Sequence, residues 1–142
     1  MTEALEAYLA AWEVHLAGGE QTTNAMLATS SDDVRYADVN MMFAGAGTMD
    51  GEPGIRQLCA GFADFASTNM GVISKHVSDD RRHWATEWEW HGTRTDSDKS
   101  FKVRGASVGT LDADGRVASQ TDYWNPAHLE AQVGPMMPSA AS

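Results

Sequence analysis

The chain is short of cysteine, of basic residues and of long apolar runs, and each shortage excludes a class of protein. Its one cysteine, Cys59, cannot form an internal disulfide, which favours the reducing cytoplasm as its location. Ten lysines and arginines stand against twenty acidic residues, and the net charge of −10 makes nucleic acid and anionic membrane surfaces unexpected partners. No apolar run approaches the ~18 residues of a membrane span and no signal-peptide pattern is present, so we expect a soluble protein.

What remains is the composition of an ordinary globular domain. Of the 142 residues, 42% are hydrophobic and 21% are charged, which is enough to build one core without disulfides or metals. No internal repeat or linker divides the chain, so we expect a single domain over 1–133. The segment 134–142 contains two prolines and ends in small residues, and it is expected to be a mobile tail.

Helical periodicity is confined to the first half of the chain. Apolar residues at spacings of three and four predict a helix over about 3–17, and shorter helices are expected over about 20–29 and from Pro53 onward. The apolar face of the first helix contains Leu5, Tyr8, Leu9, Trp12 and Leu16, and that of the third contains Ile55, Leu58, Cys59, Phe62 and Phe65.

Strand patterns fill the second half, and Asn125-Pro126 is typical of the cap and first turn of a short final helix. Three helices followed by four hairpin-linked strands predict an α+β fold, with the helices packed on one face of a curved antiparallel sheet. A turn is expected at 30–33 and a loop at 39–51. The expected strands cover 34–38, 72–78, 82–92, 100–111 and 116–124.

The last strand contains the most informative residue, Asp122. Alternation along a strand places Gln120, Asp122 and Trp124 on one face. A carboxylate beside a tryptophan is costly in a dry core unless it is hydrogen-bonded, so this face is expected to border a pocket. There the pKa of Asp122 would rise and the group could serve as a general acid or base. The alternative is a carboxylate at the sheet rim that is solvated or holds a backbone amide.

Two further segments suggest a site for a flat organic molecule. Trp84, Thr86 and Trp88 share one face of a strand with Trp90, where the alternative is simple core packing. Asp38 ends the first strand beside an apolar loop, which makes it a candidate base or else an ordinary strand-end turn residue.

The histidines do not form a convincing metal site. His83 and His91 lie on one strand face but about 26 Å apart. His76 would face His83 across the hairpin only if Asp79-Asp80 were a tight two-residue turn, and no metal-binding spacing supports that pair. Neither a metal nor a cofactor is expected, and nucleophilic serine or cysteine catalysis has no support.

Several short motifs, in this order, resemble the SnoaL-like branch of the nuclear transport factor 2-like superfamily over about 3–130. They are Tyr36-Ala-Asp38, Gly51-Glu-Pro-Gly-Ile-Arg56, Glu87-Trp-Glu-Trp-His-Gly92, Arg104-Gly-Ala-Ser-Val108, Asp114-Gly-Arg-Val117 and Asp122-Tyr-Trp-Asn125. The resemblance implies a cone-shaped, cystatin-like α+β barrel in which helices close a curved sheet over an apolar pocket. It also implies a homodimer paired through the sheet and cofactor-free chemistry such as polyketide cyclisation, ketosteroid isomerisation, epoxide hydrolysis or dehydration.

Residue by residue, the resemblance matches Asp122 to the acid/base of the aldol cyclases and epoxide hydrolases, and Asp38 to the base of the ketosteroid isomerases. The same comparison implies a ligand-binding set of Tyr8, Trp12, Trp84, Thr86, Trp88, Ser107, Gln120 and Trp124. This chain departs from the epoxide hydrolase pattern, because Trp84-Ala-Thr86 replaces an Arg-x-Asp pair. It also has Ser107 where the isomerases place a protonated acid.

The sequence therefore predicts an acid/base enzyme that binds a hydrophobic, carbonyl-bearing cyclic molecule, with polyketide-cyclase-like or isomerase-like chemistry. Two alternatives remain open at this stage. One is a non-catalytic dimeric binding module of the same fold, and the other is an epoxide hydrolase or dehydratase. A pKa of Asp122 raised toward neutrality would favour the enzyme, and an ordinary acidic value would favour the binding module.

Overall fold

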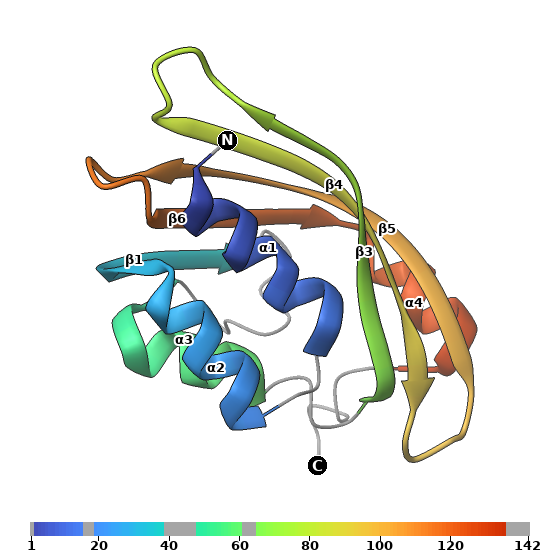
Figure 1. Ribbon diagram of the computed structural model, residues 1–142. Helices are drawn as coiled ribbons and strands as arrows, with labels where there is room; N and C mark the ends of the chain where they lie inside the picture. Colours follow the sequence, from blue (N-terminus) through green and yellow to red (C-terminus); the bar gives the residue numbers. More distant parts are fainter. Residues whose placement is uncertain (1, 16–18, 39–47, 61–64, 136–142) are drawn as a thin grey trace.

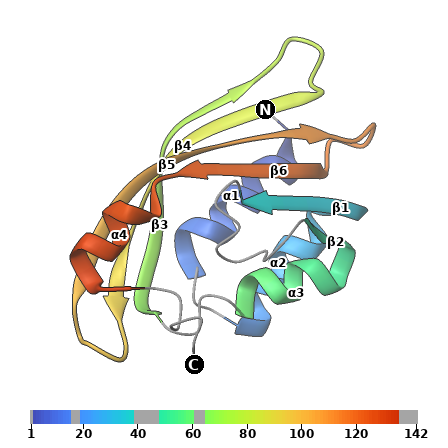
Figure 2. The ribbon, with the colours of Figure 1, turned by 180° about the vertical axis from the view of Figure 1, so that it is seen from behind.

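The fold is an open, curved sheet with helices packed into its concave side (Figures 1 and 2). The computed structural model describes residues 2–15, 19–38, 48–60 and 65–135. Its helices are α1 (Glu3–His15), α2 (Gly19–Ala28), α3 (Gly51–Ala60) and α4 (Pro126–Val133). Its strands are β1 (Ser30–Asp38), β2 (Met49–Asp50), β3 (Phe65–Val77), β4 (His83–Arg94), β5 (Ser100–Leu111) and β6 (Val117–Trp124).

The α+β class is confirmed, and the sheet differs from the expected antiparallel one at a single pairing. The strand order is β2-β1-β6-β5-β4-β3, and β3 to β6 form the expected antiparallel succession. β1, however, pairs with β6 in parallel. After β1 the chain forms β2, α3 and the three strands β3 to β5, and β6 then runs beside β1 in the same direction. Local turn patterns predict hairpins but contain no information about such a long-range pairing.

Element boundaries differ from the predictions at three places. Residues 30–33, expected to form a turn, begin β1, where Ser30 and Ser31 are buried. The third helix ends at Ala60, and Phe65 begins β3 instead of extending the helix. A two-residue strand, β2, was not predicted. Phe62, Leu16 and the loop 39–47 lie outside the described residues.

The ends of the last helix are well defined. The Asn125 side chain accepts a hydrogen bond from the Ala127 amide, which confirms the predicted cap. At the other end Arg94 donates to the carbonyl oxygens of Val133, Gly134 and Pro135, at 3.3, 3.3 and 2.7 Å. These bonds fix the first two residues of the predicted tail, and 136–142 lie outside the described residues.

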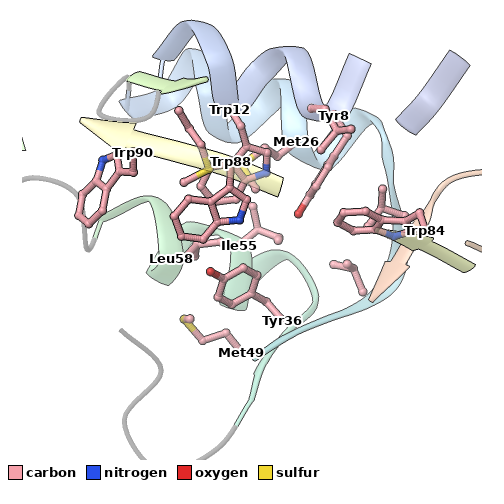
Figure 3. Close-up of a cluster of buried hydrophobic side chains, with 14 of the residues drawn as sticks. Tyr8, Trp12, Met26, Tyr36, Met49, Ile55, Leu58, Trp84, Trp88 and Trp90 are labelled. Carbon is pink, nitrogen blue, oxygen red and sulfur yellow. The ribbon is translucent and has the colours of Figure 1, made fainter. Parts of the chain in front are cut away.

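The core is unusually aromatic because tryptophans from the sheet meet tyrosines and tryptophan from β1 and α1. Figure 3 shows these side chains converging from the helices and the sheet. The predicted inward face of β4 is confirmed, since Trp84, Trp88 and Trp90 are all at most 3% exposed. Two indoles lie directly against the backbone of β5: that of Trp88 against Gly105 and that of Trp84 against Gly109. Any side chain at these glycines would occupy the space of the rings.

The opposite face of the sheet is open. Ile73, Val108 and Tyr123 are exposed there, and a hollow of about 540 Å³ lies over the row His76, Ala85, Val108 and Thr121. His76 pairs with Ala85, so it does not lie opposite His83 as a tight turn would require. The expected pairing of two chains through this face stays a prediction, as does the cytoplasmic location. Among the described residues, no helix is long and apolar enough to cross a membrane.

Candidate active site

Strand register brings the predicted polar residues into one line across the concave face. Thr86 of β4 lies opposite Ser107 of β5, Ser107 lies opposite Asp122 of β6, and Asp122 lies beside Asp38 of β1. All four side chains are at most 6% exposed. We call these four residues the polar row.

Bulky aromatic residues flank the polar row on both sides. On one side the neighbouring line contains the aromatic Tyr36 of β1 and Trp84 of β4, with Gln120 of β6 between them. On the other side it contains Trp124 of β6 and Trp88 of β4. The polar groups are therefore enclosed by rings that exclude water. In such surroundings electrostatic interactions are stronger than in water, and an unpaired polar group is costly.

Asp122 is the centre of a hydrogen-bond network. Its Oδ1 accepts hydrogen bonds from the Ser107 hydroxyl at 2.5 Å and from Gln120 Nε2 at 2.8 Å. Its Oδ2 accepts one from the Tyr36 hydroxyl. Three donors from three different strands thus fix one buried carboxyl group. This arrangement excludes the alternative of a solvated rim carboxylate.

Two more aromatic side chains hold the network from outside. The Trp88 indole donates to Ser107 Oγ at 2.8 Å, and the Tyr8 hydroxyl donates to Gln120 Oε1 at 2.5 Å. Because Tyr8 occupies the amide oxygen, Gln120 must present its NH₂ group to Asp122. Tyr8 belongs to α1, so the first helix of the chain orients a side chain on the last strand. Burial raises the pKa of Tyr8, which therefore stays a donor at ordinary pH.

Burial also raises the pKa of the Asp122 carboxyl well above its ordinary value of 3.8. A shift in this direction suits a carboxyl group that takes up and releases a proton. It also makes folding stability depend on pH, because a raised pKa stabilises the folded state less as the pH rises.

We expect the stability advantage of the wild type over Asp122→Asn to shrink as pH rises. A carboxyl whose pKa is higher in the folded state contributes its full stabilisation below the unfolded-state pKa of about 4, and loses it as pH rises toward the folded-state value. Within that window the difference in unfolding free energy should fall by about 1.4 kcal/mol per pH unit. Urea unfolding of both proteins at pH 4, 6 and 8 measures it. Parallel pH dependence in the two proteins would contradict a raised pKa.

Asp38, the second predicted catalytic residue, has a different partner. It is 3% exposed and its Oδ2 accepts a hydrogen bond from the Trp124 indole at 2.8 Å. It is thus a buried residue and not a solvated turn residue. Trp124, from the face predicted for β6, also meets Trp90 edge-on at 6.0 Å between ring centroids.

The remaining predicted residues lie on the concave side in other roles. Trp12 stacks on Tyr36 with ring centroids 6.5 Å apart, and Tyr8 meets Trp84 edge-on at 6.3 Å. Thr86 belongs to the polar row, but its hydroxyl donates to the Ser74 carbonyl oxygen at 2.7 Å instead of joining the network around Asp122.

Sequence reasoning missed Tyr36, which bonds Asp122 directly. The signal was present, because Tyr36 precedes Asp38 by two positions and alternation places both side chains on one face of β1. This alternation could not show that Tyr36 reaches Asp122, because that contact depends on the pairing of β1 with β6.

The sequence also contains Gly105-Ala-Ser107-Val-Gly109, which matches the letters of a G-x-S-x-G nucleophile elbow and was not predicted as a motif. These residues lie within the continuous strand β5 and not at a strand-to-helix turn. Ser107 donates to Asp122 and no histidine bonds it among the residues described, so the expectation against serine nucleophilic catalysis is unchanged. The described residues also contain no cluster of three or more His, Cys, Asp or Glu able to hold a metal ion.

The fold and the polar row define an α+β protein in which an acid is buried between helices and the concave face of an open, curved sheet. The chain belongs to the SnoaL-like domain family, whose model matches residues 5–120. That match confirms the resemblance seen in the sequence, and it ends two residues before Asp122. No curated protein matches the chain in sequence.

Solved structures agree with this assignment. A protein with a ketosteroid isomerase-like fold from Catenulispora acidiphila DSM 44928 is 23% identical, with a TM-score of 0.75 over 97% of this chain and 99% of that one. A candidate SnoaL-like polyketide cyclase from Jannaschia sp. CCS1 is 15% identical, with a TM-score of 0.75 over 95% and 93%. TerC is 14% identical, with a TM-score of 0.74 over 94% and 100%. At these identities the likeness concerns the fold alone.

Proposed function

We propose that this protein is a cofactor-independent acid/base enzyme acting on a hydrophobic cyclic molecule that contains a carbonyl group. The observation that carries the proposal is the buried Asp122 carboxyl, fixed by Tyr36, Ser107 and Gln120 within aromatic walls. Fixed donors and a raised pKa are the features that proton-transfer catalysis requires. The reaction we favour is proton transfer at the carbon next to the carbonyl, as in polyketide-cyclase-like or isomerase-like chemistry.

Each neighbouring group has a defined task in this proposal. Asp122 takes or gives the proton, and Asp38 supports it from the adjacent position on β1. Ser107 and Gln120 hold the carboxyl group, while the indoles of Trp84, Trp88 and Trp124 bind the ligand's rings and exclude water. The Thr86 hydroxyl, already bonded to backbone, contributes the shape of the wall and no hydrogen bond to the ligand.

Structural neighbours show that this fold can hold organic molecules, without identifying a ligand for this chain. TerC was co-crystallised with polyporic acid, and the Catenulispora protein was solved in complex with trimethylamine. Members of this fold therefore hold chemically different molecules, and function must be argued from the site. The aromatic flanks of the polar row are suited to packing against a ring system.

The experiment follows proton transfer itself, so it does not require the final product to be known. Purified protein is incubated in deuterated water with polycyclic ketones, flavonoid-like aromatics and polyporic acid. Mass spectrometry measures deuterium incorporation into each compound, and tryptophan fluorescence measures binding. The proposal predicts a bound ketone that exchanges hydrogen beside its carbonyl faster than in buffer. Binding without exchange would favour a non-catalytic binding module, and a complete absence of binding would refute a ligand site among these aromatic rings.

A further inference from the structure

The geometry points to Tyr36 as the positioning residue that sets the protonation of Asp122, and to Oδ2 as the one carboxyl oxygen through which Asp122 acts. This inference rests on the proposed function and deepens it, because it says which atom works and which residue controls it. Its basis is the different occupancy of the two carboxyl oxygens.

Oδ1 of Asp122 is already occupied. Ser107 gives its single hydroxyl hydrogen to Oδ1, and its own oxygen accepts from Trp88 Nε1 at 2.8 Å and Gln120 Nε2 at 3.4 Å. Gln120 donates to the same Oδ1 at 2.8 Å. Two donors at one oxygen leave it no place for a proton, because a hydrogen there would meet a hydrogen of Ser107 or Gln120. When Asp122 is protonated, the proton must therefore be on Oδ2.

Among the described residues Oδ2 has one partner, the Tyr36 hydroxyl, and this partner can reverse its role. When Asp122 is ionised, Tyr36 donates to Oδ2. When Asp122 is protonated, Oδ2–H donates to the Tyr36 oxygen, and the tyrosine hydrogen is released for another acceptor. Gln120 and the Tyr8 hydroxyl that orients it cannot reverse in this way, because their bonds already form one directed chain. Tyr36 alone among the described partners of Asp122 follows its protonation state.

The position of Tyr36 is firmly held, which makes its effect specific. It is 2% exposed, lies beside Gln120 in the pairing of β1 with β6, and stacks on Trp12. The other titratable groups that face Asp122 are Tyr8 from α1 and Asp38 from β1. Among the contacts described for Asp122 none comes from Lys, Arg or His, so Tyr36 provides the adjustable stabilisation of the ionised form.

The test is a titration that needs no ligand. Carbon-13 NMR of aspartate side chains follows the Asp122 carboxyl, assigned by its absence in Asp122→Asn. We expect Tyr36→Phe to raise its titration midpoint by about one to two pH units, because a hydrogen bond to the ionised form is lost. The matched control is Tyr123→Phe, which removes a half-exposed hydroxyl on the other face of β6 and should leave the midpoint unchanged. An unchanged midpoint in Tyr36→Phe would overturn the inference.

A second measurement covers the case in which Tyr36→Phe does not fold. The chain has three tyrosines, so a Tyr8→Phe/Tyr123→Phe protein grown with 3-fluorotyrosine contains the fluorinated ring only at position 36. The fluorinated phenol is the stronger donor and should lower the Asp122 midpoint relative to the unlabelled double variant. A midpoint that does not move would contradict the role of Tyr36.

The two proposals can fail separately. If the wild type catalyses no deuterium exchange, the proposed function fails, while the titration still decides the role of Tyr36. If exchange occurs, the acid side of its pH profile should move upward in Tyr36→Phe with the NMR midpoint, and stay in place in Tyr123→Phe. Exchange whose pH profile is the same in Tyr36→Phe as in wild type would overturn the inference and leave the proposed function standing.

Discussion

Asp122→Asn should lower the rate of ligand deuterium exchange by about 100-fold to 10,000-fold, the usual contribution of a positioned general acid or base. Ligand affinity should remain close to that of the wild type, because the change alters one atom and no ring. The amide oxygen can accept from Ser107 and Gln120 as Oδ1 does. The amide nitrogen can donate toward Tyr36 as the protonated acid would. The network therefore persists while the transferable proton is lost.

A matched control separates this loss from a general effect of charge removal. Asp114→Asn removes an exposed carboxylate from the turn before β6, and its exchange rate should equal that of the wild type. Fluorescence titration gives binding for all three proteins, and mass spectrometry gives exchange. A rate in Asp122→Asn within a few-fold of the wild type would mean that another group transfers the proton. Asp38 would then be the first group to replace.

A large stability effect should come from a glycine in β5 that no bulky residue could replace. Gly109→Ala should reduce the free energy of unfolding by about 3 kcal/mol, toward the upper end of the usual cost of overpacking. A methyl group there would collide with the Ser119 carbonyl oxygen and would lie 2.6 Å from the Trp84 indole nitrogen. The carbonyl belongs to the strand ladder and cannot move freely, so the Trp84 ring or the sheet must shift.

Gly71→Ala provides the comparison within the same sheet. Its added methyl group would have Glu89 O at 3.9 Å and Asn69 Oδ1 at 4.0 Å, which are ordinary contacts. We expect this variant to be neutral or to gain up to about 0.5 kcal/mol from reduced flexibility of the unfolded chain. Urea unfolding of wild type, Gly109→Ala and Gly71→Ala measures both effects. Equal stability of the two variants would mean that Trp84 does not need the bare backbone of β5.

Much of the site was predictable because alternation along a strand is a local property. The inward faces of β4 and β6 follow from two-residue periodicity, which correctly placed Trp84, Trp88, Gln120 and Asp122. Periodicity within single strands could not show that Ser107 bonds Asp122, because that requires the register between β5 and β6. Even so, the resemblance to a known family had suggested Ser107 as a pocket residue.

The rest could not be predicted because it depends on contacts between segments far apart in the chain. Tyr36 reaches Asp122 only because β1 pairs in parallel with β6, across 86 positions of sequence. Tyr8 orients Gln120 across 112 positions. Neither the parallel pairing nor the helix position leaves a pattern in the local sequence. The same limitation explains why a turn was wrongly predicted at 30–33. These polar residues begin β1, and the first two of them are buried.

Placing the acid in a nearly closed network has a consequence for how a ligand would reach it. Asp122 is 6% exposed and its described partners are buried, as are the flanking Trp84 and Trp88, so a ligand cannot reach the carboxyl directly from solvent unless these side chains move. The open hollow of about 540 Å³ on the opposite face is larger than many single-ring ligands but contains none of the polar row. A ligand that binds this protein could therefore lie either beside the polar row on the concave side or in the hollow on the opposite face.

The crystal structure of a complex with the tightest ligand from the panel tests the account most directly. We predict that the ligand lies on the concave side among Trp84, Trp88 and Trp124, with an oxygen or the exchanging carbon next to Asp122 Oδ2 and the Tyr36 hydroxyl. A ligand seated instead in the hollow around His76 and Val108, with the network of Asp122 unchanged, would contradict an acid/base role for the polar row.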